Sequence, residues 1–125
     1  MNNLWVLAIG VALLGGLGSV LRFALASWQR SLPWGILAAN TAASIVVGFA
    51  AAMNLFGHSQ NLVLSTVLAT GFAGGLSTFS SWAAQTVALL ARGRRLQGYL
   101  NVLLNMVLPV SGAIAGLILG ASLLK

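Results

Sequence analysis

The sequence predicts an all-α membrane protein with four transmembrane helices in a single domain, residues 1–125. Only 5% of the residues are charged and 59% are hydrophobic, whereas a soluble domain typically has about 25% charged residues. Too few polar groups are present to face water on all sides, so lipid is the expected solvent. Four apolar stretches alternate with short polar breaks, and each approaches or exceeds the roughly 20 residues that span a bilayer.

The first two expected helices cover approximately residues 4–26 and 32–56. Trp28 and Trp34 flank the break between them, where amphipathic rings favour the lipid headgroups. A cleaved signal peptide is the alternative interpretation of the first segment. Its start lacks the positive charge that such peptides carry, so a retained helix is favoured. The second helix has small and polar residues every four positions, and these share one face: Asn40, Ser44 and Gly48.

The third expected helix, approximately residues 62–91, contains the adjacent Gly74 and Gly75, and four hydroxyl residues follow closely: Ser77, Thr78, Ser80 and Ser81. Each glycine weakens a helix by about 1 kcal/mol relative to Ala, and the hydroxyls compete for backbone partners. Together they predict a break near the bilayer centre. A break at that depth is tolerated where it lines a wet cavity, and its freed carbonyl and N–H groups can hold ions. A kink that serves packing alone is the alternative.

The fourth expected helix, approximately residues 96–124, places Asn101 and Asn105 on one face. Pro109 lacks an N–H, so the carbonyl of Asn105 loses its usual helical donor. A glycine stripe follows at Gly112, Gly116 and Gly120, and it favours close packing against another helix. For the asparagines, interhelical hydrogen bonding and the lining of a polar pathway remain equally open.

The basic residues predict the orientation in the membrane. They lie mainly at the first and third breaks, with only the last residue on the opposite side: Arg22 and Arg30, then Arg92, Arg94 and Arg95, against Lys125. Because cytoplasmic loops are enriched in Lys and Arg, both breaks are expected in the cytoplasm and both termini outside. Nucleic-acid binding is not expected, since it requires a clustered basic face on a solvated domain.

The chain has no Asp, Glu or Cys and a single histidine, His58. This composition excludes carboxylate general acid–base pairs, carboxylate-bound metals, thiolate chemistry and proton coupling through a buried acid. His58 falls in an expected loop and is interpreted as a solvated histidine. No nucleophile–base pair can therefore be assembled in the spans, and enzymatic activity is not expected.

Four motifs, in order along nearly the whole chain, carry a family resemblance. The stretch Gly74–Trp82, which reads GGLSTFSSW, resembles the signature of the Fluc (CrcB) fluoride channels. Gly15–Arg22 resembles the family's first-helix motif, Gly35–Asn40 its second-helix motif, and Arg92–Arg94 the loop before its last helix.

The resemblance implies a passive, fluoride-selective channel in the bacterial inner membrane that exports fluoride and protects against its toxicity. It also implies an antiparallel dimer with two pores and one structural Na⁺ at its centre. The positions that match the family's fluoride pathway are Asn40, Phe79, Ser81, Trp82, Asn101, Asn105 and Arg22. The positions that match its sodium ligands, through backbone carbonyls, are Gly74 and Ser77.

Two residues depart from the family pattern: Trp82 replaces a phenylalanine and Gln85 replaces an acidic residue. Because tryptophan is larger, a non-conducting or half-active partner subunit of a heteromeric channel is the alternative function. The charge bias also favours a homologous partner over an identical one, since a chain that inserts in both directions has little Lys/Arg asymmetry. A non-transporting scaffold is a further alternative. A small multidrug exporter is disfavoured, because it requires a carboxylate within the membrane.

Overall fold

A computed structural model of the chain describes residues 2–57 and 62–124. His58 and Lys125 therefore lie outside the described residues. The helical elements, in order, are α1 (Asn2–Ala26), α2 (Trp34–Phe56), α3 (Leu62–Thr66), the π-helix η2 (Val67–Ala73), α4 (Gly74–Leu76), α5 (Phe79–Ala91) and α6 (Arg95–Leu124).

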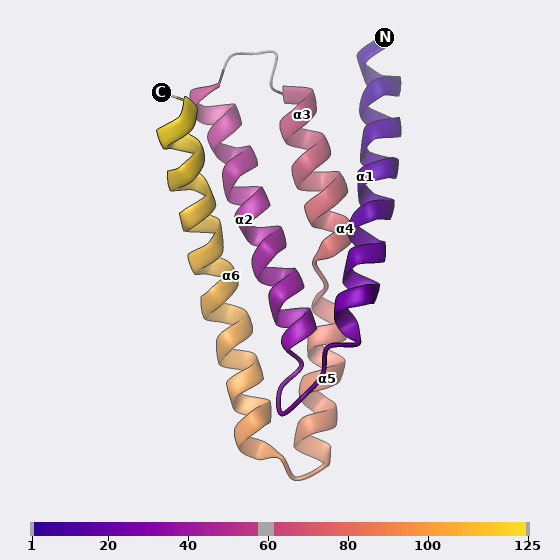
Figure 1. The fold of residues 1–125 in the computed structure, drawn as a ribbon, viewed down its shortest axis with the longest axis vertical. Coiled ribbons are helices and arrows are strands. Elements are labelled where there is room, and N and C mark those ends of the chain that lie inside the picture. Colours follow the sequence, from indigo (N-terminus) through magenta and orange to yellow (C-terminus); the bar gives the residue numbers. More distant parts are fainter. Residues whose placement is uncertain (1, 58–61, 125) are drawn as a thin grey trace.

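Four helical segments are long and apolar enough to cross a membrane, as predicted: Leu4–Ala26, Trp34–Phe56, Leu62–Ala91 and Arg95–Leu124. Both ends of the chain lie at one end of the bundle, and the α1–α2 and α5–α6 loops lie at the other (Figure 1). The loops expected in the cytoplasm and the termini expected outside therefore lie at opposite ends of the bundle.

The two described loops are shaped by proline and by glycine: the first loop leads into the start of α2, and the second follows the end of α5. α2 begins directly after Pro33, which has no N–H to leave unsatisfied at a helix start. At the end of α5, Gly93 has φ +73°, a conformation that glycine adopts without steric cost. The N–H of Gly93 donates to the carbonyl of Leu90, and the N–H of Arg94 to that of Leu89. These two bonds form a Schellman motif and turn the chain sharply into α6.

Helix pairing rests on glycines, as the stripe in the fourth span predicted. α2 packs along α6, and a Cβ built on Gly48 would overlap the carbonyl oxygen of Ala113. In the same way, a Cβ on Gly116 would overlap the carbonyl of Ile45. The backbones of the two helices approach too closely for any side chain at these positions.

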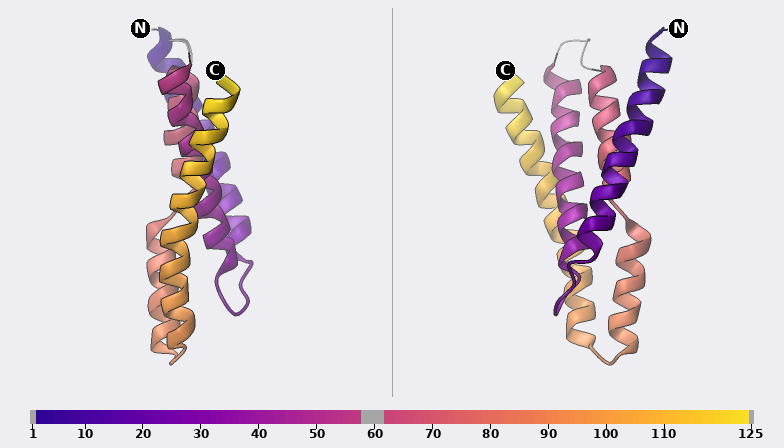
Figure 2. Two further views of the ribbon diagram at one scale, coloured as in Figure 1. Left: turned by 90° about the vertical axis from the view of Figure 1, so that its left-hand side faces the viewer. Right: turned by 45° about the vertical axis from the view of Figure 1, so that its right-hand side comes forward.

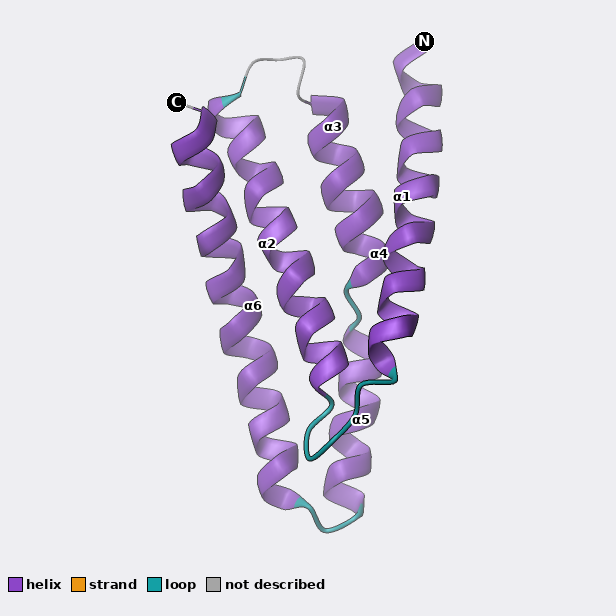
Figure 3. Ribbon diagram, in the orientation of Figure 1, coloured by secondary structure: helices purple, strands orange, loops and turns teal. Residues whose placement is uncertain are grey.

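The third span is interrupted between α4 and α5, near its middle (Figure 3). Ser77 (ψ 153°) and Thr78 (φ −154°, ψ 122°) are extended, and α5 starts at Phe79. Below the break, α5 runs beside the first half of α6 (Figure 2). The predicted interruption is thus confirmed, although the adjacent glycines do not form it.

Gly74 and Gly75 remain helical, and the break falls after them. The smallness of Gly75 serves packing, because a Cβ there would overlap the carbonyl of Gly15 in α1, whereas a Cβ on Gly74 would make only ordinary contact. The π-helical stretch before them was not predicted. Its backbone hydrogen bonds span one residue more than those of an α-helix, on the segment that packs against α1.

Candidate ion pathway

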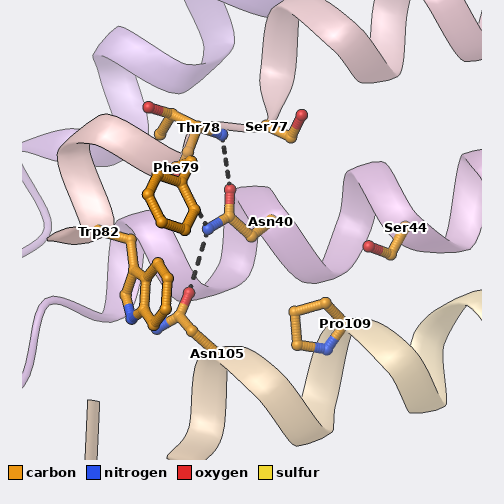
Figure 4. A pocket seen from close by; sticks show the side chains of 8 residues that line it. All are labelled: Asn40, Ser44, Ser77, Thr78, Phe79, Trp82, Asn105 and Pro109. Atoms are coloured by element: carbon orange, nitrogen blue, oxygen red, sulfur yellow. Dashed lines mark hydrogen bonds between the residues drawn. The ribbon is translucent and has the colours of Figure 1, made fainter. Parts of the chain in front are cut away.

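The backbone freed at the break is bound by the side chain of Asn40, which α2 presents to it (Figure 4). The N–H of Thr78 donates to Asn40 Oδ1 at 2.8 Å, and Asn40 Nδ2 donates to the carbonyl of Thr78 at 3.3 Å. One amide therefore satisfies both backbone groups of a residue that is only 9% exposed. This clamp fixes the extended conformation in place of a helical turn.

A chain of amides continues from this clamp into α6. Asn40 Nδ2 also donates to Asn105 Oδ1 at 3.1 Å. Asn105 Nδ2 in turn donates to Asn101 Oδ1 at 3.1 Å, and Asn101 Nδ2 to Thr86 Oγ1 at 2.9 Å. The amide donors of Asn40 and Asn105 are therefore directed at protein oxygens. An anion that binds them must take the place of one of those oxygens.

Hydroxyl groups cap the start of α5. The N–H of Ser81 donates to Thr78 Oγ1 at 3.2 Å, and Thr78 Oγ1 donates to Ser81 Oγ at 3.2 Å. Since Ser81 Oγ accepts that bond, its own hydroxyl hydrogen is not used within this pair. The helix start also has a partial positive charge, which favours anions. The break thus presents a hydroxyl donor and a helix N-terminus at the same depth.

A cavity of about 280 Å³ opens beside the break, between α2, α5 and α6 (Figure 4). Its lining residues are Asn40, Ser44, Ser77, Thr78, Phe79, Trp82, Asn105 and Pro109. Polar groups from α2, the break and α6 therefore meet at one place.

Four predicted pathway residues line this cavity: Asn40, Phe79, Trp82 and Asn105. The other three do not, since Ser81 lies in the adjacent cap, Asn101 is 2% exposed, and Arg22 belongs to α1. Thr78 and Pro109 were not assigned to the pathway. The proline's four-residue spacing from Asn105 was the signal that could have placed it there.

Two aromatic rings form one wall of the cavity. Phe79 and Trp82 meet edge to face, with ring centroids 5.1 Å apart and planes at 73°. The indole N–H of Trp82 donates to the carbonyl of Asn101 at 3.2 Å. That N–H is therefore engaged with α6 and is not free to donate to an ion in the cavity. Phe79 is 75% exposed, which leaves this side of the cavity uncovered by the chain itself.

Backbone carbonyls at the break are the groups that could hold a cation, because the described residues contain no cluster of His, Cys, Asp or Glu suited to a metal. The N–H of Thr78 is the i+4 donor for the carbonyl of Gly74, but it is directed to Asn40. The carbonyl of Ser77 accepts from Arg22 Nη1 at 3.3 Å. Freed carbonyls suit Na⁺, so the residues fit the ion, although Arg22 competes for one of them.

Comparison with known proteins gives one consistent answer. Residues 9–117 match the family described as CrcB-like protein, Camphor Resistance (CrcB). A relative from Nitratiruptor sp. is 32% identical over 124 residues, which cover 95% of this chain and 94% of the relative. One from Parabacteroides distasonis is 35% identical, covering 99% and 97%, and one from Pyrococcus abyssi is 33% identical, covering 84% and 88%. Each of the three is named "Fluoride-specific ion channel FluC".

Proposed function

From the premise that the chain belongs to the CrcB/FluC family of fluoride-specific ion channels, we propose that it conducts fluoride passively through the cavity beside the broken third span. Because the chain belongs to this family, it is a multi-pass membrane protein of the channel class and not an enzyme. The observation that supports this proposal is that the cavity, the helix break and the start of α5 coincide.

Fluoride is strongly hydrated, so a pore must replace its water with other donors. Asn40 and Asn105 offer amide N–H groups that now donate to protein oxygens, and a fluoride ion would replace one of those oxygens as the acceptor. Ser81, in the helix cap beside the cavity, has a hydroxyl hydrogen that is not used by Thr78. Phe79 and Trp82 present ring edges, where aromatic rings have positive character. With no Asp or Glu in the chain, nothing in these walls forms the ring of negative charge that cation channels use.

The exposed Phe79 supports a dimer, because a large aromatic ring beside a polar cavity leaves one wall to be supplied by another subunit. We propose an antiparallel pair in which each subunit's broken span faces the other. The carbonyls of Gly74 and Ser77 would hold a Na⁺ between the two subunits, and that charge would fix the broken spans together. Asn101, buried behind Trp82, then serves the pathway by orienting Asn105.

The charge asymmetry of the loops favours a homologous subunit of opposite bias as the partner, rather than an identical one. The alternative is that this chain is the non-conducting subunit of such a pair. The bulk of Trp82 favours that alternative. Its engaged N–H favours conduction, because the bond to α6 holds the indole at the wall.

Fluoride efflux from liposomes that contain the purified chain tests conduction. We expect passive fluoride flux with little chloride flux. Phe79→Ile should reduce the flux at least tenfold, because it removes the ring edge from the cavity. Phe23→Ile is the matched control, since Phe23 is 83% exposed on α1 and does not line the cavity. Equal chloride permeation would contradict the proposal, as would absence of flux both alone and with a homologous partner.

A further inference from the structure

A second cavity, of about 180 Å³, lies at the end of the bundle where the two described loops meet. One water needs roughly 10–15 Å³ of such space, so the cavity has room for a polyatomic group. Its walls come from the α1–α2 loop, the last turns of α5 and the α5–α6 loop. It shares no lining residue with the ion pathway.

Three arginines line this cavity: Arg30, Arg92 and Arg94. The chain has no Asp or Glu, so no side-chain carboxylate neutralises them. Arg94 Nη2 donates to the carbonyl of Ser31 at 2.7 Å, which ties the two loops together and holds the rim in place. Arginine has five donors, so further N–H groups of Arg94 remain for a ligand. This charge and geometry suit the bidentate binding of a phosphate.

The inner wall adds an acceptor that lacks a donor. Gln85 lines the cavity, and its Oε1 is buried without a hydrogen-bond partner in the described part of the chain. Leaving a buried acceptor unsatisfied costs about 1–3 kcal/mol. A phosphate oxygen cannot relieve this, because it has no hydrogen to donate. A ligand that carries both a phosphate and a hydroxyl satisfies the arginines and Gln85 together.

The cavity also lies at the depth of the lipid headgroups, since it sits where the spans end. Trp28, in the adjoining loop, is 50% exposed, and tryptophan favours that interface. The buried Leu32 and Leu89 supply apolar surface beside the arginines. Basic pockets between spans at the cytoplasmic face bind anionic lipid headgroups.

We propose that this cavity binds the headgroup of an anionic phospholipid with a hydroxylated headgroup, such as phosphatidylglycerol. Arg30, Arg92 and Arg94 hold the phosphodiester, and a glycerol hydroxyl donates to Gln85 Oε1. The bound lipid joins the α1–α2 loop to the α5–α6 loop, and so stabilises the end of the bundle at which α5 turns into α6.

Native mass spectrometry of the purified full chain with phosphatidylglycerol and phosphatidylcholine tests this. The wild type should retain phosphatidylglycerol preferentially. Arg30→Gln and Arg92→Gln should each reduce its retention about fivefold, which corresponds to about 1 kcal/mol per basic residue. Arg95→Gln is the matched control, because Arg95 adjoins the same loop but does not line the cavity. Equal loss in Arg95→Gln, or equal retention of both lipids by the wild type, would overturn the proposal.

Two further comparisons in the same assay, one with a second lipid and one with inorganic phosphate, identify the ligand. Phosphatidylethanol has the same singly charged phosphodiester but no headgroup hydroxyl, so the wild type should retain it less than phosphatidylglycerol, and Gln85→Leu should abolish that difference. An unchanged difference in Gln85→Leu would refute the role of Gln85. Equimolar inorganic phosphate should not displace the lipid, and displacement would show a free-anion site instead. Circular dichroism and a single elution peak establish that each variant folds.

Discussion

The side chain of Asn40 holds the broken third span to both α2 and α6. Its three bonds join positions 38 and 65 residues away in the sequence. Asn105 and Asn101 continue the chain to Thr86. Because each amide is oriented by the next, loss of one member affects both the geometry of the break and the donors beside the cavity. In the proposed pathway, stability and conduction would therefore be coupled at these residues.

Asn40→Ala should lower both stability and flux. The N–H of Thr78 would remain buried without an acceptor, at a cost of about 1–3 kcal/mol. Thermal unfolding in detergent and fluoride efflux measure the two effects. Ser44→Ala is the control at the same cavity, and its stability should change by less than about 0.5 kcal/mol, as for substitutions away from bonded networks. An Asn40→Ala variant as stable as the wild type would contradict the clamp.

Trp82→Phe should retain fluoride flux and lose about 1 kcal/mol of stability. The substitution keeps an aromatic ring at the wall but removes the indole bond to the carbonyl of Asn101. The same efflux and unfolding assays measure it. Complete loss of flux would show that the indole itself is required, whereas higher flux would show that its bulk narrows the pathway.

At the scale of the elements, the third span combines two functions in one sequence. Its first half packs tightly against α1 through glycines, and its second half starts a new helix with a hydroxyl cap. The break falls where packing against α1 ends. α2 and α6, by contrast, form an unbroken pair whose close approach depends on glycines from both helices. This pair is the frame on which Asn40 and Asn105 are positioned.

Gly116→Val should separate α2 from α6, because its Cβ would overlap the carbonyl of Ile45. Overpacking of this kind typically costs about 1–3 kcal/mol, and the displaced Asn105 should reduce flux as well. Gly16→Val is the matched control, since a Cβ at Gly16 meets nothing within 4 Å. Unfolding temperature and efflux again give the result. Equal effects of the two substitutions would argue against the packing role of Gly116.

At the scale of the whole molecule, the charge distribution is polarised. The five arginines lie at or toward the end formed by the α1–α2 and α5–α6 loops. The chain alone also leaves many large apolar side chains uncovered, and only 6% of the residues in the most apolar stretch of α1 are buried. Lipid and, in the proposed dimer, a second subunit would cover them.

The absence of native cysteine makes the orientation measurable. Ser27→Cys and Ser122→Cys place a single thiol near opposite ends of the bundle, at exposed positions. With a membrane-impermeant reagent on intact cells, Ser122→Cys should react and Ser27→Cys should not. Comparable labelling of both would show that the chain inserts in two orientations. The charge asymmetry would then no longer favour a homologous partner over an identical one.

The four spans, the interruption of the third and the polar faces of the second and fourth could all be predicted from the sequence. These depend on local hydropathy, on helical spacing and on glycine and hydroxyl content, all of which are visible along the chain. Only the packed structure shows that the interruption begins after the glycines, where Gly75 is helical and packs closely against α1. It also decided that the amides of Asn40 and Asn105 bind each other, that Arg22 reaches Ser77, and that two loops enclose a basic cavity. These features join residues that are distant in sequence, and no local pattern specifies which donor meets which acceptor.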